Sequence, residues 1–509
     1  MTRSSPARRG EQDRARDSRD APGARDAAVD ATPGKAGRRS SGAPGGGGGK
    51  VPPRTRSRRP TGALAREQMR MQQRLRLAVA MIEAIDADGY RATRVADVIA
   101  RAGVSRKTFY EHFDNKQDCL LWTFDVVAAE LVRRVEEAFR ETDGWRERIE
   151  AAIGALFGSA IQNPGALRLS LLEIATVGPA GIERRERATQ RFERFLHDAL
   201  SLAPGEGTVP PAVLKAIVGG FNRVLYRRVP GGDASELLAL IPDLTRWAAS
   251  YYPSPPAIVG EPRRLPRARR DAIALDGGRA PGTLAPHPLL GGRRGLPRGD
   301  HNVSRSFVVQ SQRARILDAV TILVAQESYA ALKVEDIAEH AAVSLVAFYE
   351  HFLDKEDAFL VAYEVGLGKA MSGIERAYAA QEDWRLAIRA GIGALFGFLA
   401  SEPAFAHISL LDAMIATPRT AERARVGVSA LARLLVPGVE RTEGQAPPAV
   451  TVEAIGGGLF ELALHYALEG RIAELPELVP TASYIALAPF VGAEQAAQIA
   501  TARPASSGR

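Results

Sequence analysis

Residues Arg91–Lys116 read RATRVADVIARAGVSRKTFYEHFDNK, and this stretch decides the fold of the chain around it. Gly103 predicts the end of a first short helix, because glycine adopts the left-handed backbone conformation without steric cost. Ser105 is the predicted cap of a second helix, and Phe109 and Phe113 lie four residues apart on one side of it, where they face a core. The first helix presents an apolar face made by Val95, Val98 and Ile99.

A third helix is predicted from Asn115, with Asp118 as its capping-box partner. A helix, a glycine turn and a short basic helix together indicate a helix-turn-helix whose second member enters a DNA major groove. The stretch resembles the DNA-binding domain of TetR/AcrR-type transcriptional regulators. The residues that carry the resemblance are Thr93, Val95, Asp97, Ala102-Gly103-Val104-Ser105, Phe109-Tyr110, His112-Phe113 and Lys116.

The composition of this 509-residue chain predicts two to four domains and a cytoplasmic protein. Its single cysteine, Cys119, excludes an intrachain disulfide, and no apolar run approaches the eighteen residues of a membrane helix. The net charge of +8 is unevenly spread, because residues 1–60 contribute +9, residues 253–304 contribute +5 and the remainder −6. Residues 1–60 have almost no large apolar side chains, and residues 253–304 are rich in Pro, Gly and Arg, so we expect a disordered arm (1–60) and a disordered linker (253–304).

Residues 63–250 show helical patterns without strand-like alternation, which predicts an all-α fold. The expected helices are 63–88, 95–102, 105–112, 115–141, 145–161, 165–176, 180–202, 210–229 and 234–250. The TetR resemblance implies that three of these nine helices form a DNA-binding domain, here called the head. It implies that the others form a ligand-binding and dimerising body.

The whole pattern then repeats. Tyr110, Trp145, Ile153–Gly158 (IGALFG) and Pro164 recur 239 positions later, and Pro210–Val213 recurs 237 positions later at Pro447–Val450. We therefore predict two tandem nine-helix TetR-like units. The expected boundaries are a first head at 61–120, a first body at 121–252, a second head at 305–360, a second body at 361–495 and a disordered tail at 496–509.

The second head keeps the scaffold and loses the basic side chains. Arg106-Lys107-Thr108 corresponds to Leu345-Val346-Ala347, and the net charge falls from +3 over Arg91–Lys116 to −3 over Ala330–Lys355. Since DNA affinity depends on cations that neutralise phosphates, we predict that the first head binds DNA and that the second is degenerate. The alternative is that both heads bind DNA, because an apolar triplet could still contact a thymine methyl group.

The predicted DNA-binding residues all belong to the first head. Arg106, Lys107 and Thr108 are the expected base contacts. Tyr110 and Lys116 match the family's phosphate-contacting residues, whereas His112 suits phosphate contact and packing equally. A basic arm segment, Arg54–Arg59, could reach the minor groove or only attract phosphates. The full predicted set is Thr93 (also the expected cap of the first helix), Arg94, Ser105, Arg106, Lys107, Thr108, Tyr110, His112 and Lys116.

The predicted ligand residues are polar groups that interrupt apolar runs of the bodies, namely Arg168, Glu173, His407 and Asp412. Five positions on an α-helix turn through about 140°, so neither pair was expected to share a face, and a purely structural role was the favoured alternative. Glu461 and His465 are four apart without a third ligand, so we predict no metal and no cofactor. Cys119 is expected to pack in a core.

The predicted function is sequence-specific transcription regulation, as a repressor released from a double-stranded DNA operator by an unknown small-molecule ligand. The alternative is an interaction protein whose second unit has lost DNA binding and serves as a dimerisation partner. No nucleophile–base pair or phosphate loop indicates an enzyme.

The linker of about fifty residues has an expected span of about 39 Å, close to the 34–36 Å between heads one DNA turn apart. It therefore permits residues 210–250 and 448–490 to pair within one chain as an intramolecular pseudo-dimer. A homodimer that pairs two first units is the competing arrangement. Paired glycines, Gly219-Gly220 and Gly456–Gly458, would let the two backbones approach closely.

Overall fold

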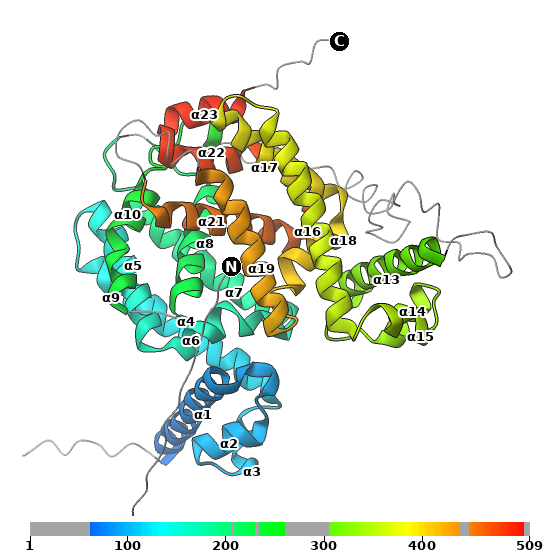
Figure 1. Ribbon diagram of the computed structural model, residues 1–509. Coiled ribbons are helices and arrows are strands. Elements are labelled where there is room, and N and C mark those ends of the chain that lie inside the picture. Colours follow the sequence, from blue (N-terminus) through cyan, green and yellow to red (C-terminus); the bar gives the residue numbers. More distant parts are fainter. Residues whose placement is uncertain (1–61, 206, 230–233, 260–304, 437–446, 503–509) are drawn as a thin grey trace, which may run out of the picture. The chain divides into compact units, whose positions relative to one another are not determined.

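The computed structural model describes residues 62–205, 207–229, 234–259, 305–436 and 447–502 (Figure 1). Within these ranges the chain forms helices joined by short turns, with no β-strand, so the predicted all-α fold is confirmed. The predicted arm with Arg54–Arg59 and all of the predicted linker after residue 259 lie outside the described residues.

The first unit follows the predicted helices, with three differences. The first helix continues to Ala92 through a kink at Gly89, where φ is +76°; the predicted 165–176 helix changes to a 3-10 turn; and the last helix divides before Pro242. The observed elements are α1 (Gly62–Ala92), α2 (Val95–Ala102), α3 (Arg106–His112), α4 (Lys116–Arg140), α5 (Trp145–Gln162), α6 (Pro164–Leu171), η1 (Glu173–Val177), α7 (Pro179–Leu200), α8 (Pro211–Arg228), α9 (Ala234–Ala239), α10 (Ile241–Ala249) and α11 (Pro256–Val259).

The second unit repeats this order. Its elements are α13 (Arg305–Glu327), α14 (Val334–His340), α15 (Leu345–His351), α16 (Lys355–Ala379), α17 (Trp384–Ser401), α18 (Pro403–His407), η3 (Ile408–Asp412), α19 (Pro418–Ala432), η4 (Arg433–Leu435), α21 (Ala449–Leu468), η5 (Ile472–Leu478), α22 (Val479–Val491) and α23 (Ala493–Thr501). The tail predicted from residue 496 is partly helical instead. In α23, Ala496, Ala497 and Ala500 share one face and are buried, so packing holds this segment.

Both heads have the same internal construction, with the buried face of α1 (Leu77, Met81 and Ile85) or of α13 (Ile316, Val320 and Val324) packed over a two-helix motif. Phe109 and Phe113 are at most 1% exposed, and Phe348 and Phe352 occupy the same places in the second head. The turn between the two motif helices is left-handed in both copies, with φ +60° at Gly103 and φ +50° at Ala342. An arginine supports each turn, since Arg76 donates to the Ala102 carbonyl at 2.5 Å. Arg315 donates to the equivalent Ala341 carbonyl at 2.9 Å.

The two units meet through α8 and α21, with α10 and α22 packed beside them (Figure 1). Both crossing helices carry glycines at the contact, and a Cβ built on Gly219 would lie 3.4 Å from the Gly457 carbonyl oxygen. Nearby, the buried Tyr251 hydroxyl donates to the Ile485 carbonyl at 2.8 Å. The Tyr484 hydroxyl in turn donates to the Tyr251 carbonyl at 3.2 Å. The helices predicted to pair, 210–250 and 448–490, are therefore in contact within this chain.

Candidate DNA-binding site and ligand pocket

Helix α3 presents a cationic outer surface on a rigid support. The Ser105 hydroxyl accepts a hydrogen bond from the Thr108 amide at 3.0 Å, so the predicted cap is present. Arg106 and Lys107 are exposed in the first turn, and the Lys107 side chain is 88% accessible. Tyr110 is 47% exposed, and the Arg106 guanidinium lies 5.7 Å from its ring centre. Cations and a hydroxyl thus point away from the core, as contact with phosphates and base edges requires.

Thr93 does not belong to this outer surface. The observed cap of α2 is Arg94, so the prediction that Thr93 caps this helix is wrong. Thr93 is 2% exposed, and its hydroxyl donates to the Gly89 carbonyl at 2.8 Å across the kink of α1. A hydroxyl held in this way supports the turn between α1 and α2 and is unavailable to DNA.

Lys116 is also engaged inside the head. Its ammonium donates to the carbonyl oxygens of Tyr90 at 2.9 Å and Thr93 at 2.8 Å, and it lies 4.1 Å from the centre of the Tyr90 ring. Burial lowers the pKa of this ammonium group, and the nearby Glu173 opposes that effect. Lys355 bonds to the equivalent Tyr329 and Leu332 carbonyls. Because the second head keeps the lysine without the basic triplet, the shared lysine stabilises the turn.

His112 is also hydrogen-bonded within the head. Its Nε2 atom lies 3.0 Å from the Gln73 Oε1 atom, and the second head repeats this pair as His351 and Gln312 at 3.3 Å. Burial, followed by the charges of Arg74 and Arg70, lowers the pKa of His112. Of the two predicted roles, packing has the structural support.

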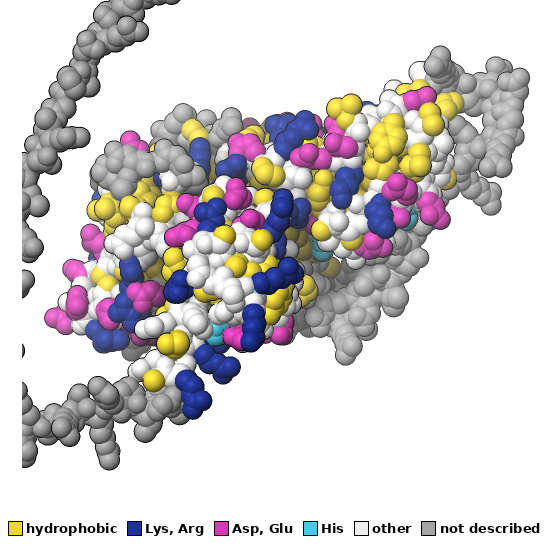
Figure 2. Space-filling model, turned by 90° about the horizontal axis from the view of Figure 1, so that it is seen from below, with side chains coloured by type: hydrophobic (Ala, Val, Ile, Leu, Met, Phe, Trp, Pro, Cys, Tyr) yellow, Lys and Arg dark blue, Asp and Glu magenta, His cyan; other side chains and the backbone are white. Residues whose placement is uncertain are grey.

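The second head displays apolar side chains where the first displays cations. Leu345 is 43% exposed and Val346 is 70% exposed at the start of α15, and Leu353 after that helix is 83% exposed. In the space-filling view, dark blue Lys and Arg side chains gather over the α1–α3 part of the face, whereas yellow and magenta side chains dominate over α13–α15 (Figure 2). The two heads therefore share a backbone arrangement but differ in the charge and polarity of their exposed side chains.

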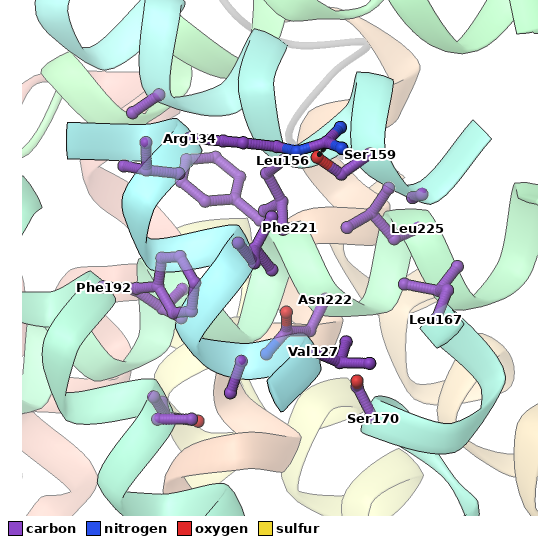
Figure 3. Close-up of a pocket in the computed structure, with 18 of the residues that line it drawn as sticks. Val127, Arg134, Leu156, Ser159, Leu167, Ser170, Phe192, Phe221, Asn222 and Leu225 are labelled. Atoms are coloured by element: carbon purple, nitrogen blue, oxygen red, sulfur yellow. Dashed lines mark hydrogen bonds between the residues drawn. The ribbon is translucent and has the colours of Figure 1, made fainter. Parts of the chain in front are cut away.

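The first body contains a cavity of about 490 Å³ bounded by α4, α5, α6, α7 and α8. Its walls are mostly apolar, and a few polar side chains project into it. Figure 3 shows Arg134 and Ser159 together at one end, Asn222 and Ser170 further along, and Phe192, Phe221 and Leu225 among the apolar walls. The Arg134 guanidinium donates to Gln162 at 2.9 Å and to Ser159 at 3.5 Å. An apolar cavity with a few oriented polar groups is typical of a small-molecule site.

The equivalent cavity of the second body is about 130 Å³. Aromatic rings fill the difference, because Ala166 corresponds to Phe405 and Ser159 to Phe398, each 239 positions later. The Phe398 and Phe405 rings pack edge to face at 5.6 Å, and Gly373 stands where the first body has Arg134. The second cavity is thus smaller than the first, and none of the residues that line it is charged.

The predicted ligand residues do not line either body cavity. Arg168 pairs with Glu173 at 3.2 Å and donates to the Asp86 carbonyl of α1 at 3.3 Å. These two side chains therefore connect the body to the head, and the ligand-binding prediction for them has no support in the described cavities. No residue type alone could have located the cavity. The signal lay in the comparison of the two units, because the polar residues Arg134 and Ser159 correspond to Gly373 and Phe398 in the second unit.

His407 and Asp412 form the matching pair in the second body. His407 Nε2 lies 3.3 Å from Asp412, whose other oxygen accepts from the Tyr329 amide of the second head at 3.2 Å. The expectation that residues five apart cannot share a face is wrong for both pairs, because neither segment is a continuous α-helix. Ile408–Asp412 is a π-helix, which brings positions five apart together, and α6 ends at Leu171 before Glu173.

The remaining candidates have structural surroundings. Cys119 is fully buried, and burial raises the pKa of its thiol to about 12. Glu461 pairs with Arg185 and His465 lies 3.4 Å from Glu186, and the described residues hold no group of three potential metal ligands. None of the described helices is alone long and apolar enough to span a membrane, although one pair bent by 106°, α17 with Pro403–Asp412, passes by length and composition.

Comparison with known proteins agrees with this construction. The family described as "Bacterial regulatory proteins, tetR family" matches residues 78–121 and 316–362. The chain is 24% identical over 171 residues to the HTH-type transcriptional activator FasR of Mycolicibacterium smegmatis, which covers 33% of this chain and 73% of that protein. It is 29% identical to the HTH-type transcriptional regulator EthR of the same species, with 30% of this chain and 71% of that protein covered.

A third relative is the fatty acid metabolism regulator protein of Bacillus subtilis, 25% identical over 118 residues, with 23% of this chain and 59% of that protein covered. The solved structure of FadR from Bacillus subtilis in complex with stearoyl-CoA is similar to 34% of this chain and 96% of its own, at 18% identity and a TM-score of 0.31. Both family matches fall on a helix-turn-helix of the described structure, one in each half. The chain is therefore a TetR-type DNA-binding regulator with two TetR-like units in tandem.

Proposed function

We propose that the chain is a ligand-responsive transcription regulator in which the first head alone recognises operator DNA. The observation that carries this proposal is the contrast between α3 and α15. The two helices have the same cap and the same buried phenylalanines, but one exposes Arg106 and Lys107 and the other exposes Leu345 and Val346. Only Arg106 and Lys107 supply hydrogen-bond donors for the acceptor atoms of base edges and phosphates.

Arg106, Lys107 and Thr108 are the proposed base contacts, and Tyr110 is the proposed phosphate contact. Arg94 at the start of α2 and Ser105 at the start of α3 are exposed and complete the surface. Thr93, His112 and Lys116 are left out of it, because their polar atoms have partners within the head.

The ligand is proposed to occupy the cavity of the first body. Its mostly apolar walls favour a long aliphatic molecule, and the Arg134 guanidinium, whose Nε atom pairs with Glu130 at 2.9 Å, would offer its other N–H groups to a polar or anionic end of that molecule. The name of one relative, the fatty acid metabolism regulator protein of Bacillus subtilis, supports an acyl chain as the occupant. The second body would bind no ligand of this size, since Phe398 and Phe405 fill the equivalent space.

Ligand binding would release the DNA through a movement of α6. Leu167, Ser170 and Leu171 of this helix line the cavity, and Arg168 of the same helix holds the Asp86 carbonyl near the end of α1. A ligand that displaces α6 would therefore move the support of the first head, which suits a repressor released by its ligand in the cytoplasm.

The rival function is an interaction protein in which the second unit only pairs with the first. The exposed Leu345, Val346 and Leu353 favour that view of the second head, because they cannot bind phosphates. In the proposed function the two units pair within one chain, and each chain then brings one DNA-binding head to an operator. A homodimer through two first units would bring two.

Two experiments test the proposal. Selection of bound sites from random DNA should return a single half-site per chain, and the absence of any enriched sequence would favour the rival function. Acyl-CoA titration should show binding that Ala166→Phe abolishes, because the ring fills the first cavity. The matched variant Phe405→Ala, in the second body, should leave the first site intact. Equal loss in both variants would contradict the placement of the ligand.

A further inference from the structure

The two interface helices share one sequence frame with opposite charges at its ends. In α8 the frame is Lys215-Ala-Ile-Val-Gly-Gly-Phe-Asn-Arg223, and in α21 it is Glu453-Ala-Ile-Gly-Gly-Gly-Leu-Phe-Glu461. The alanine, the isoleucine and the glycine pair are retained at the same positions. Both charged positions change sign between the units, so Lys215 corresponds to Glu453 and Arg223 to Glu461.

The packing of the helices supports this register independently of the sequence. A Cβ built on Gly219 would lie 2.4 Å from the Glu461 Cβ, and a Cβ built on Gly457 would lie 2.2 Å from the Arg223 Cβ. The next glycine of each helix also contacts the equivalent residue of the other helix, since Gly220 lies against the Ala454 carbonyl and Gly458 against the Ala216 carbonyl. A pseudo-two-fold relation therefore exchanges Arg223 with Glu461.

The carboxylates of the second unit are buried against cations of the first. Glu461, with a side chain 7% exposed, lies 2.7 Å from the Arg185 guanidinium of α7. Glu453, also 7% exposed, lies 2.9 Å from Arg228 at the end of α8. The second unit offers no substitute for Arg185, because the corresponding residue of α19 is Ala424.

We propose that these buried charges make the first unit select a second unit as its partner and reject another first unit. In a pair of first units, Arg223 would stand in the place of Glu461, opposite Arg185. Lys215 would stand in the place of Glu453, but Glu186 and Glu193 of its own unit already pair with it at 2.8 Å, so the contact of Arg223 with Arg185 carries the rejection. Like charges in a desolvated interface oppose the wrong pairing.

A pair of second units is disfavoured for a different reason. Glu461 would face Ala424 in place of Arg185, and the neighbouring cation of α19, Arg425, already pairs with Glu422, so the buried ion pair of Glu461 would be lost. The partner that fits the first unit is thus a second unit, and the linker supplies the one in the same chain at millimolar effective concentration. This inference rests on the proposed pairing of the units but not on DNA binding, so the assay below can fail while the DNA assay succeeds.

The test uses two full-length chains with reversed interface charges. One chain carries Glu453→Lys and Glu461→Arg, so both of its units are cationic at the interface. The other carries Arg185→Glu and Arg228→Glu, so the two first-unit residues that pair with Glu461 and Glu453 become carboxylates. Each chain alone should lose its internal pairing by a hundredfold or more, as expected for broken buried ion pairs. Light scattering should show expansion of each without a stable complex.

Mixing the two chains should restore both interfaces between molecules, and light scattering should then report twice the mass of one 54.6 kDa chain. A single chain with all four substitutions should return to the wild-type mass and size, which shows that the substituted residues are tolerated when complementary. Arg184→Glu is the matched control, because Arg184 pairs with Asp125 inside the first unit at 3.1 Å. This control should keep the wild-type mass and size.

Three results would overturn the inference. The first is wild-type behaviour of either charge-reversed chain alone. The second is stable self-association of the chain whose interface is cationic in both units. The third is failure of both the mixture and the four-substitution chain to recover, since complementary charges would then not determine the pairing.

Discussion

Replacement of Arg106 and Lys107 by alanine should abolish specific DNA binding and leave the fold intact. Both side chains are exposed, and their contacts along α3 are the Lys107–Glu111 pair at 3.8 Å and the Arg106 guanidinium 5.7 Å from the Tyr110 ring centre. An exposed ion pair contributes about 0.3–0.5 kcal/mol and an exposed cation–ring contact about 0.5–1 kcal/mol, while alanine is the best helix former, so the free energy of unfolding should fall by no more than about 1 kcal/mol. Loss of two base contacts, at about 1–3 kcal/mol each, should weaken DNA binding by about a hundredfold or more.

The assay is a titration of the selected DNA site at several salt concentrations, together with denaturant unfolding of the same samples. The matched control is Leu345→Ala with Val346→Ala at the equivalent positions of the second head, which should keep DNA affinity within about threefold. If the two cations contact phosphates, the salt slope should also fall by about 0.9 per cation, whereas contacts to base edges alone leave it nearly unchanged. Unchanged affinity in the first variant, or an equal fall in both variants, would refute the assignment of α3.

Three further predictions concern stability and reactivity. Gly219→Ala should destabilise the chain by about 1–3 kcal/mol in denaturant unfolding, because the new methyl group meets the side chain of Glu461, while Gly397→Ala, with nothing within 4 Å, should be neutral or stabilising. Cys119 should resist iodoacetamide until the protein unfolds, since burial raises the pKa of its thiol to about 12; rapid labelling of the native chain would contradict this. Burial opposes ionisation of Glu186, but hydrogen bonds from His465 and Lys215 hold its pKa at about 2, below the ordinary 4.5. The contribution of Glu186 to the free energy of unfolding is therefore present above about pH 4.5 and is lost as the pH falls towards 2. Glu186→Gln should flatten the dependence of the free energy of unfolding on pH in that range.

Local patterns predicted the heads well because their determinants are local. Gly103 is left-handed, Ser105 caps α3, and Phe109 and Phe113 are buried, all as the spacing of residues indicated. The predictions of partners for polar side chains were less accurate. Thr93 and Lys116 look like DNA contacts in the sequence, yet each bonds to backbone carbonyls near the end of α1. Those carbonyls lie at the break at Gly89, next to the predicted helix end at residue 88, but no motif of the sequence indicated that Thr93 and Lys116 bond to them.

Comparison of the two copies would have separated these roles. Lys116 and His112 persist in the degenerate head as Lys355 and His351, and they make the same contacts there. Residues that change between copies, such as Arg106, carry the chemical difference. The same comparison marks the cavity, where Ala166 is replaced by the bulky Phe405.

The sequence by itself determined the all-α class, the duplication, the helix-turn-helix of each unit and which of the two heads carries the net positive charge. These follow from spacing, glycine positions and charge, which act over a few residues. Only the tertiary structure decided the size of each cavity and the ion pairs of Glu453 and Glu461. A cavity is a difference between volumes contributed by several helices, and an ion pair between units depends on how two distant helices cross at their glycines.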